Sequence, residues 1–173
     1  MTLKQVFWGL LLAALLSPTA VAHGPKDLPD DPNLLEQYRQ GHTAYRNDDY
    51  AAAQRHWQPL ADQGSSAAQL FLGFMHANGQ GVPKDGEKAA YWYAEAAERD
   101  NAVAQIRLAL IYRDGSGVAV DRVKALFWAK MAGRAENHMQ KIGQALQRSL
   151  EEIMTREEIA AAEEMFDAQS KEH

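Results

Sequence analysis

Apolar residues recur at the spacing of an α-helix along most of this chain. In the segment that begins near Asn33, apolar or small residues stand at positions 34, 35, 38, 41, 44 and 45. After a polar turn at 46–49, the spacing resumes at positions 50, 53, 57, 60 and 61. Such a period places these side chains on one side of a helix. Pro59 should loosen the last turn of the second helix and Gly64 should end it, so residues 33–66 are predicted to form a helix pair.

The two blocks that follow, Ala68–Asp100 and Ala104–Glu136, repeat one another at an offset of 36 residues (104 − 68). An internal period of this length is typical of stacked-repeat proteins. The repeated alanines let neighbouring helices approach closely, and Leu72 and Trp92 are expected to fill the core between the helices of a pair. Eleven of the 33 aligned positions are identical without a gap: Ala68/Ala104, Gln69/Gln105, Leu72/Leu108, Gly79/Gly115, Gly81/Gly117, Val82/Val118, Asp85/Asp121, Lys88/Lys124, Ala89/Ala125, Trp92/Trp128 and Ala96/Ala132.

The middle of each block predicts a chain reversal between two helices. Paired glycines, at 79 and 81 and again at 115 and 117, permit positive φ where the first helix ends. Val82 and Val118 are expected to hold the reversing loop on the core. Asp85 and Asp121 stand where an N-cap would begin the second helix.

The repeat pattern is lost after Asn137. Residues 138–154 form an amphipathic segment with apolar side chains in line at positions 142, 145, 146, 150 and 153. Thr155 to Glu158 is a capping-box sequence that should open a last helix with positions 159, 162, 165 and 166 on one side, and the tail 169–173 should be frayed. We expect these two helices to close the end of the stack; a partner-binding helix hairpin is the alternative.

These motifs resemble a known family of repeats. Gly41-x-x-Ala44, Asp48-Asp49-Tyr50, Ala53, Trp57 and Leu60 are similar to a tetratricopeptide helix pair. The two blocks are similar to its 36-residue relative, the Sel-one-like repeat of secreted bacterial proteins. The first copy carries Ala67-Ala68-Gln69, Leu72-Gly73, Gly79-x-Gly81-Val82, Asp85, Lys88-Ala89, Trp92 and Ala96-Ala97; the second carries Ala102-x-Ala104-Gln105, Leu108, Tyr112, Gly115-x-Gly117-Val118, Asp121, Lys124-Ala125, Trp128 and Ala132. The departures are His76 for the usual tyrosine, Ala109 for the glycine and Gly133 for the second alanine.

The resemblance implies an all-α protein, an α-α superhelix or solenoid of helix-turn-helix repeats with capping helices at the C-terminus. We divide the chain into a cleaved signal peptide (1–22), a flexible leader (23–32), a tetratricopeptide-like helix pair (33–66), the first Sel-one-like repeat (67–102), the second (103–137) and a helical cap (138–173). Each helix pair has apolar surface on two sides and cannot bury it alone, so the pairs should stack.

The first 22 residues have the pattern of a signal peptide. A positive start with Lys4 precedes an apolar run at 6–16, and Ala20-Val21-Ala22 is a small-x-small cleavage sequence. The alternative, a membrane anchor, needs about 20 apolar residues, and this run has 11 (6 to 16 inclusive). We therefore expect cleavage after Ala22, a periplasmic or secreted location and no stable membrane insertion afterwards. The leader that follows is rich in proline and aspartate, which favours disorder.

Composition excludes several classes of function. The chain contains no cysteine, which excludes disulfides, thiolate metal sites, a cysteine nucleophile and a lipid-anchored lipoprotein. Its net charge is −5, and loss of Lys4 with the signal makes it 17 − 23 = −6, which argues against nucleic-acid binding. His23, as a new amino terminus, could chelate copper, but no strand pattern supplies a second histidine on a rigid sheet, so we favour a disordered leader.

No other pattern indicates catalysis, a metal or a cofactor. The six histidines fall in separate elements without the spacing of zinc ligands. The paired glutamates near the C-terminus have the setting of solvated helix faces rather than an acid/base dyad. The paired glycines lack the third glycine and the preceding strand of a dinucleotide loop. His76 takes the position of Tyr112 in the next block, which favours an aromatic packing role over a ligand. We predict no catalytic, metal-binding or cofactor-binding residue.

A binding surface is the remaining prediction. In tetratricopeptide-like stacks the first helix of each pair lines a concave, ligand-binding face, so the resemblance places contacts there. Aromatic residues and arginine commonly anchor interfaces, while packing of Phe74 and Leu110 against the next repeat is the alternative. Specificity is expected where the blocks differ, at Phe71/Arg107, His76/Tyr112 and Ala77/Arg113. The candidate partner-binding residues are Tyr38, His42, Tyr45, Phe74, Asn78, Leu110 and Arg113.

The predicted function is a non-catalytic protein–protein interaction module, an adaptor or scaffold of the periplasm or cell envelope. We expect it to be monomeric alone and to hold a protein or peptide partner without a cofactor. Two alternatives stay open. One is a secreted hydrolase of cell-wall-related substrates, since some secreted members of the family act on β-lactams, although those resemble a cysteine-stapled subgroup. The other is a permanent structural subunit of an envelope or secretion assembly.

Overall fold

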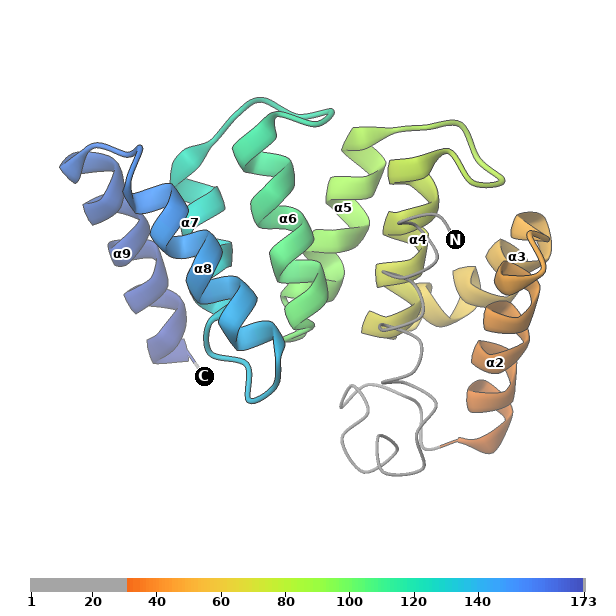
Figure 1. The fold of residues 1–173 in the computed structure, drawn as a ribbon. Coiled ribbons are helices and arrows are strands. Elements are labelled where there is room, and N and C mark those ends of the chain that lie inside the picture. The colour runs from red at the N-terminus through yellow and green to blue at the C-terminus, as the bar shows by residue number, and fades with distance from the viewer. Residues whose placement is uncertain (1–30, 173) are drawn as a thin grey trace.

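The computed structural model describes residues 31–172, and this part of the chain consists of helices joined by turns, without a strand. The expected signal peptide (1–22) and nearly all of the leader (23–32) lie outside the described residues. The all-α prediction is confirmed. The helices form one row from α2 to α9 (Figure 1), with the bounds α2 Pro32–Arg46, α3 Tyr50–Asp62, α4 Ser66–Asn78, α5 Gly86–Ala97, α6 Ala102–Asp114, α7 Arg122–Ala132, α8 Met139–Glu151 and α9 Arg156–Glu172.

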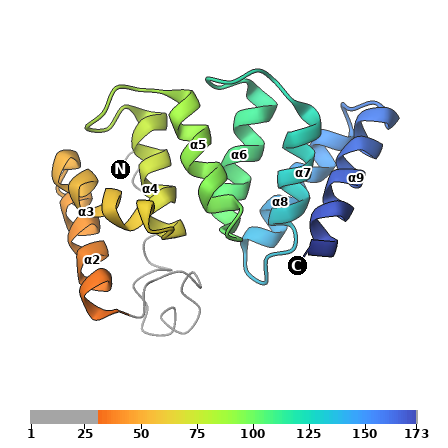
Figure 2. The same cartoon turned by 180° about the vertical axis from the view of Figure 1, so that it is seen from behind.

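Successive helices pair and stack in order. α2 packs on α3, α4 on α5 and α6 on α7, and α3 also packs on α4 and α5 on α6. The first helices of the pairs, α2, α4 and α6, lie on the side nearer the viewer in Figure 1. Their partners α3, α5 and α7 come forward in the reverse view (Figure 2). We call the side formed by α2, α4 and α6 the first-helix face.

Helix starts follow the 36-residue period through their N-caps. Asp49, Asp85 and Asp121 accept hydrogen bonds from backbone N–H groups at the starts of α3, α5 and α7. Ser65 and Asn101 do the same for α4 and α6. Each cap satisfies an N–H group that the first turn of a helix leaves without a partner. The predicted caps at Asp85 and Asp121 are confirmed.

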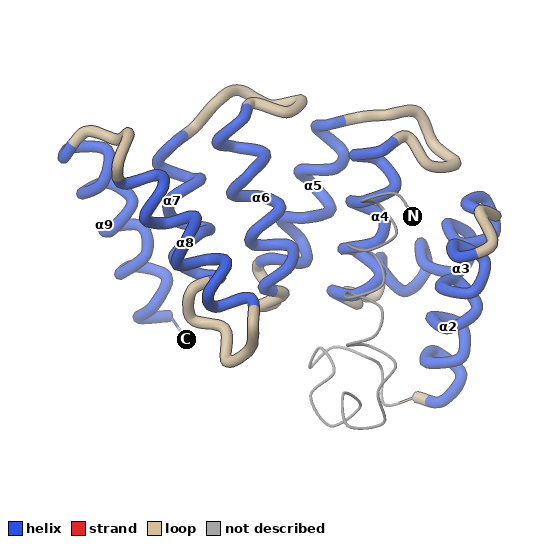
Figure 3. Tube along the Cα trace, viewed as in Figure 1, coloured by secondary structure: helices blue, strands red, loops and turns tan. Residues whose placement is uncertain are grey.

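The paired glycines reverse the chain as predicted. Gly79 and Gly115 end α4 and α6 in the left-handed conformation, with φ of 70° and 68°. A Cβ on Gly117 would clash with Cα of Gly86, because the α6–α7 loop packs directly on the start of α5. Both long loops lie along the same edge of the row, at the top of Figure 3. Glycine is therefore required here for the close approach of two backbones as well as for φ.

The first two helix pairs are each closed by one large ring against one glycine. Trp57 on α3 covers Gly41 on α2, and Tyr93 on α5 covers Gly73 on α4. A Cβ on either glycine would lie 2.5 Å from the facing ring. In the second repeat the corresponding positions hold Ala109 and Ala129, which are both fully buried. A ring on one helix thus faces a glycine on the other, and where the ring is replaced by alanine, the facing glycine is replaced by alanine too.

The expectation that Trp92 fills the core between α4 and α5 is wrong. Trp92 and its counterpart Trp128 are half-buried at the edges of the hydrophobic clusters. Tyr93, which is 2% exposed, fills the space between α4 and α5 instead, together with Leu72 at 1%. Adjacent helical residues point about 100° apart, so Trp92 and Tyr93 cannot both face α4.

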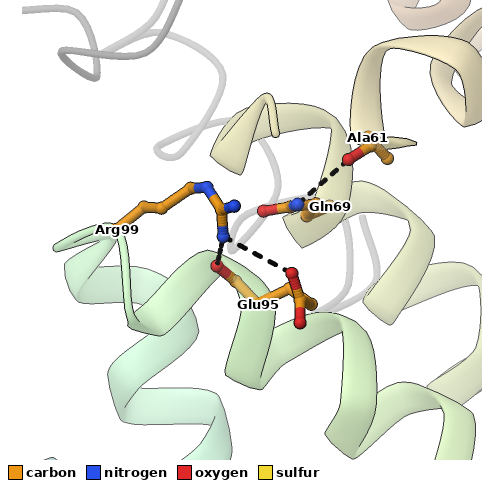
Figure 4. A network of polar contacts seen from close by, with 4 residues as sticks. All are labelled: Ala61, Gln69, Glu95 and Arg99. Carbon is orange, nitrogen blue, oxygen red and sulfur yellow. Dashed lines mark hydrogen bonds and ion pairs between the residues drawn. The ribbon is translucent and has the colours of Figure 1, made fainter. Parts of the chain in front are cut away.

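Two glutamines join neighbouring pairs. Gln69 Nε2 donates to the carbonyl of Ala61 at the end of α3 (3.0 Å), and Gln105 Nε2 donates to the carbonyl of Ala97 at the end of α5 (3.1 Å). Figure 4 shows the first junction, where the guanidinium of Arg99 lies near Gln69 and bonds to Glu95. Each glutamine adds a hydrogen bond to a carbonyl in the last helical turn, which also accepts from the turn that follows (Gly64 N–H to Ala61 and Asp100 N–H to Ala97).

The last two helices both pack on α7. The capping box is confirmed, since Thr155 N–H donates to Glu158 and Glu158 N–H donates to Thr155 Oγ1. Three details differ from expectation: Ile142 and Ile153 are 45% and 58% exposed, and α9 continues to Glu172 instead of fraying at 169. Ile153 follows the end of α8 in a turn, where the helical period no longer places it. Every helix within residues 31–172 is too short or too polar to cross a bilayer.

Candidate partner-binding site

Four of the seven predicted contact residues gather around one ring, that of Phe71 on α4. Tyr38, His42 and Tyr45 from α2 lie with ring centroids 6.2, 5.7 and 5.9 Å from Phe71, and Phe74 lies at 6.1 Å. Phe71 itself stacks on Trp57 at 4.4 Å. The cluster brings α2, α3 and α4 together, and its aromatic pairs have the separations at which such rings attract one another.

Tyr38, Tyr45 and Phe74 differ from the expected exposed contacts. They are only 9%, 6% and 6% exposed. The backbone carbonyl of Tyr38 accepts a hydrogen bond from Trp57 Nε1 at 3.2 Å, and burial raises the pKa of the Tyr38 phenol well above its usual range. In this structure the three rings contribute to packing between helices. Their direct contact with a partner stays a prediction.

A polar chain anchors Tyr45 to the loop of the first repeat. The Tyr45 hydroxyl donates to Gln80 Oε1, and Gln80 Nε2 donates to the Tyr50 hydroxyl at 3.2 Å. Tyr50 in turn donates to Asp48 at 2.6 Å. Burial raises the pKa of Tyr45, while its hydrogen bond with Gln80 acts in the opposite direction. The loop 79–85 is thereby fixed to the first helix pair.

The other four predicted residues keep some exposure. His42 is half-buried, and burial followed by the charge of Arg46 lowers its pKa. Asn78 is exposed and donates to the carbonyl of Phe74 (2.8 Å). Leu110 on α6 is half-buried at the edges of two smaller clusters. The structure therefore places His42 with the aromatic cluster, and Asn78 and Leu110 on separate parts of α4 and α6.

Arg113, the last predicted residue, is paired within the chain. Its Nε and Nη2 donate to both carboxylate oxygens of Asp114 at 2.6 and 3.0 Å. This pairing raises the pKa of Arg113 and lowers that of Asp114. Because Asp114 offsets the charge of Arg113, this position presents less positive charge to a partner.

Arg107 was expected to be a specificity position but was not among the seven predicted contact residues. This residue of α6 occupies the position of Phe71 in the preceding repeat, and its guanidinium carbon lies 4.9 Å from the centre of the Phe74 ring. Phe74 is also edge-on to Tyr93 at 5.7 Å. The signal in the sequence was the mismatch of a phenylalanine with an arginine at equivalent positions of two otherwise similar blocks.

Residues 31–172 contain no group of three or more His, Asp or Glu side chains that could hold a metal ion. His76 is 9% exposed and its Nδ1 has no hydrogen-bond partner. Burial, and next the charge of Lys88, lower its pKa. A buried, neutral ring fits the packing role expected from its equivalence with Tyr112.

Comparison with known proteins gives matches to repeats and to solved structures. The sequence profile of the Sel1 repeat matches residues 66–101 and 102–137. A protective antigen present in uropathogenic Escherichia coli strains, with an SLR fold, is similar at 28% identity and a TM-score of 0.73, over 88% of this chain and 31% of that one. A Sel1 repeat protein from Oxalobacter formigenes is similar at 31% identity and a TM-score of 0.58, over 63% of this chain and 45% of the other. This chain thus spans less than half the length of either. No curated protein matches it significantly.

Proposed function

The chain carries two Sel1 repeats, at 66–101 and 102–137, and from this premise we propose that it is a non-catalytic scaffold that holds a partner protein or peptide on its first-helix face. Sel1 repeats generally mediate protein–protein interactions, and the matches confirm the resemblance inferred from the sequence. The repeat architecture supplies a rigid row of helices, whose surfaces characteristically serve as extended binding platforms.

The observation that best supports this face is its mixture of side chains on α4 and α6. Leu110 offers partly exposed apolar surface, Asn78 offers an exposed amide, and Arg107 offers a half-buried cation. Apolar contact surface with a few polar groups that fix orientation is the usual composition of a recognition site. The second-helix side is different, because Arg122 and Lys130 on α7 pair with Glu158 and Glu163 on α9.

Site-specific photo-crosslinking tests the assignment of the face. A photoreactive amino acid replaces Asn78 on α4, and the matched control replaces Tyr91 on α5, which is 56% exposed. Both positions tolerate a new side chain because neither is buried. We expect a defined crosslinked partner in envelope extract from position 78 and none from position 91. The same crosslinks from both positions, or crosslinks from position 91 only, would contradict the proposal.

We also propose a periplasmic or extracellular location for the mature protein, which begins at His23 and is monomeric on its own. The support is the amino-terminal sequence pattern, and a similar solved structure is described as a protective antigen. Amino-terminal sequencing of the protein from fractionated cells checks the cleavage, and light scattering after gel filtration checks the mass. A full-length cytoplasmic protein would refute the location, and a stable oligomer would favour a permanent structural subunit over an adaptor.

A further inference from the structure

Arg107 differs from every other basic side chain in residues 31–172. The other partly buried cations, Arg113 and Lys130, each pair with a carboxylate, of Asp114 and Glu163 respectively. Lysines and arginines of the described chain that lack a hydrogen bond or ion pair are otherwise exposed to water. Arg107 alone is partly buried and has neither. A guanidinium in this condition has lost part of its hydration without gaining an acceptor, which is unfavourable.

The position of Arg107 is set by neighbouring rings. Its guanidinium carbon lies 4.9 Å from the Phe74 ring centre, and Phe74 contacts Tyr93 edge-on. Side chains from α4, α5 and α6 therefore meet at this point. Contact with a ring face is a favourable cation–π interaction, but the ring is not a conventional hydrogen-bond acceptor for the guanidinium N–H groups. The planar fork of Arg107 remains available to an acceptor.

Tyr93, which contacts the same Phe74 ring as the guanidinium, supplies a second donor in this region. Its side chain is 2% exposed, and no hydrogen bond of its hydroxyl exists within the described residues. Burial raises the pKa of Tyr93, and the charge of Arg107 acts against that rise, as expected for a guanidinium close to the phenol. A tyrosine hydroxyl next to an arginine fork presents several donors to one small region.

The local charge favours an anionic group from outside the chain. Although the protein has a net charge of −5, the sequence of α4 contains no acidic residue, and Asp114, the one acid of α6, is bound to Arg113. Carboxylates match an arginine fork in shape and can accept two parallel N–H bonds. Within residues 31–172, no acidic side chain provides this acceptor.

We propose that Arg107 and the Tyr93 hydroxyl form a carboxylate-binding subsite on the first-helix face, which takes one acidic group of a partner peptide. This inference rests on the proposed function, and it adds the chemistry of the partner. The acidic group is an aspartate or glutamate side chain or the carboxyl terminus of the peptide. An apolar residue next to it packs on Leu110.

The subsite occurs once, which fixes the register of the partner. In the preceding repeat the equivalent of Arg107 is Phe71, whose ring is 4% exposed and stacked on Trp57. A second carboxylate one repeat away thus finds no cation at this position. Peptides bound to this face should share one acidic position and not a series of them.

The test is selection of peptides from a randomised twelve-residue library displayed with free carboxyl termini, followed by anisotropy titrations of the selected peptides. Three variants are compared with wild type: Arg107→Met, which keeps the stem of the side chain; Tyr93→Phe, which removes only the hydroxyl; and Arg55→Met. Arg55 is an exposed, unpaired arginine on α3, so it controls for loss of one positive charge. Circular dichroism confirms that each variant is folded.

We expect the selected peptides to share one acidic position, and Arg107→Met to weaken their binding about 10- to 100-fold, the range for a charged hydrogen bond. Tyr93→Phe should weaken it less, and Arg55→Met hardly at all. Replacing the peptide's acid by its amide should cost the same factor in wild type and nothing further in Arg107→Met. Amidation of the carboxyl terminus alone identifies which kind of carboxylate binds.

Two failures are distinguishable. If peptides bind to α4 and α6 without a shared acid, or if Arg107→Met binds them as wild type does, the carboxylate subsite is wrong and the proposed function stands. If the library yields no peptide and crosslinking from position 78 captures no partner, both proposals are wrong.

Discussion

The pairing of Gly73 with Tyr93 makes the packing between α4 and α5 open to a quantitative test. A Cβ added at Gly73 would lie 2.5 Å from Cε1 and 2.6 Å from Cδ1 of Tyr93, far inside the 3.5–4.0 Å of a normal carbon contact. The ring is 2% exposed and has little room to move. Gly73→Ala should therefore strain the interface.

Two opposing free-energy terms set the expected change in stability. Overpacking a core costs about 1–3 kcal/mol, and replacing a glycine within a helix by alanine returns about 1 kcal/mol. The net destabilisation by Gly73→Ala is thus about 0–2 kcal/mol. Tyr93→Ala should cost about 3–5 kcal/mol as an aromatic truncation in the core. In that variant the ring is absent, so Gly73→Ala should stabilise by about 1 kcal/mol.

The double-mutant cycle measures the difference between the two backgrounds. The four proteins are unfolded with urea and followed by circular dichroism at the helix band. The expected coupling is about 1–3 kcal/mol, equal to the overpacking term. The double variant places alanines where the second repeat has Ala109 and Ala129, so it should fold. Should Gly73→Ala have the same effect with and without the Tyr93 ring, within about 0.5 kcal/mol, the assignment of this contact is wrong.

Three further changes test other parts of the account. Asp121→Ala should destabilise by about 1 kcal/mol through loss of the α7 cap, whereas Asp121→Asn, which keeps a capping oxygen, should cost clearly less in urea unfolding. Trp57→Ala should lower the free energy of unfolding by about 3–5 kcal/mol and Trp92→Ala by markedly less, because only Trp57 of the two is fully buried. Equal losses of stability would show that Trp92 is a core residue after all. Burial lowers the pKa of His76, so the folded protein binds this proton less tightly than the unfolded chain does. The neutral ring therefore contributes fully to stability above the unfolded pKa of about 6.5, and this contribution is lost as pH falls through the folded pKa. The melting temperature should drop between pH 7.5 and 5.5, and the drop should shrink in His76→Tyr.

The turns and helix starts were predictable because their chemistry is local. An aspartate at a fixed distance before an apolar run has one favourable use, as a cap, and Asp85 and Asp121 both have it. Gly79 and Gly115 likewise end helices in a conformation that most residues avoid. The recurrence of these signals after 36 residues gave the architecture, since two copies constrain the interpretation more than one.

The direction in which each side chain points was less predictable. Residues 66–76 of α4 are all buried, so its hydrophobic pattern has no polar side that would indicate which neighbour each residue meets. Tyr38, Tyr45 and Phe74 were assigned to an open surface because the position of the Phe71 ring between them depends on how α2 and α4 pack. Trp92 was preferred to Tyr93 because it recurs in both blocks, although recurrence does not determine the rotation of a helix.

The subsite at Arg107 could be recognised only from the structure. An arginine in the middle of a helix usually lies in water, and its sequence neighbours give no sign that it is partly buried. Its distinction is the absence of a pairing acid, which can be established only when the positions of all described carboxylates are known. The mismatch with Phe71 marked the position in the sequence, and the structure showed that the arginine there is partly buried and unpaired.

Amide mapping of the bound protein tests the central claim most directly. Chemical shifts of the backbone amides are recorded for the protein alone and for its complex with the partner captured by crosslinking. We predict that the largest changes lie on α4 and α6, around Asn78, Arg107 and Leu110, with small changes on the outer sides of α5 and α7. Changes concentrated on α5 and α7, with α4 and α6 unaffected, would contradict a scaffold that binds through its first-helix face.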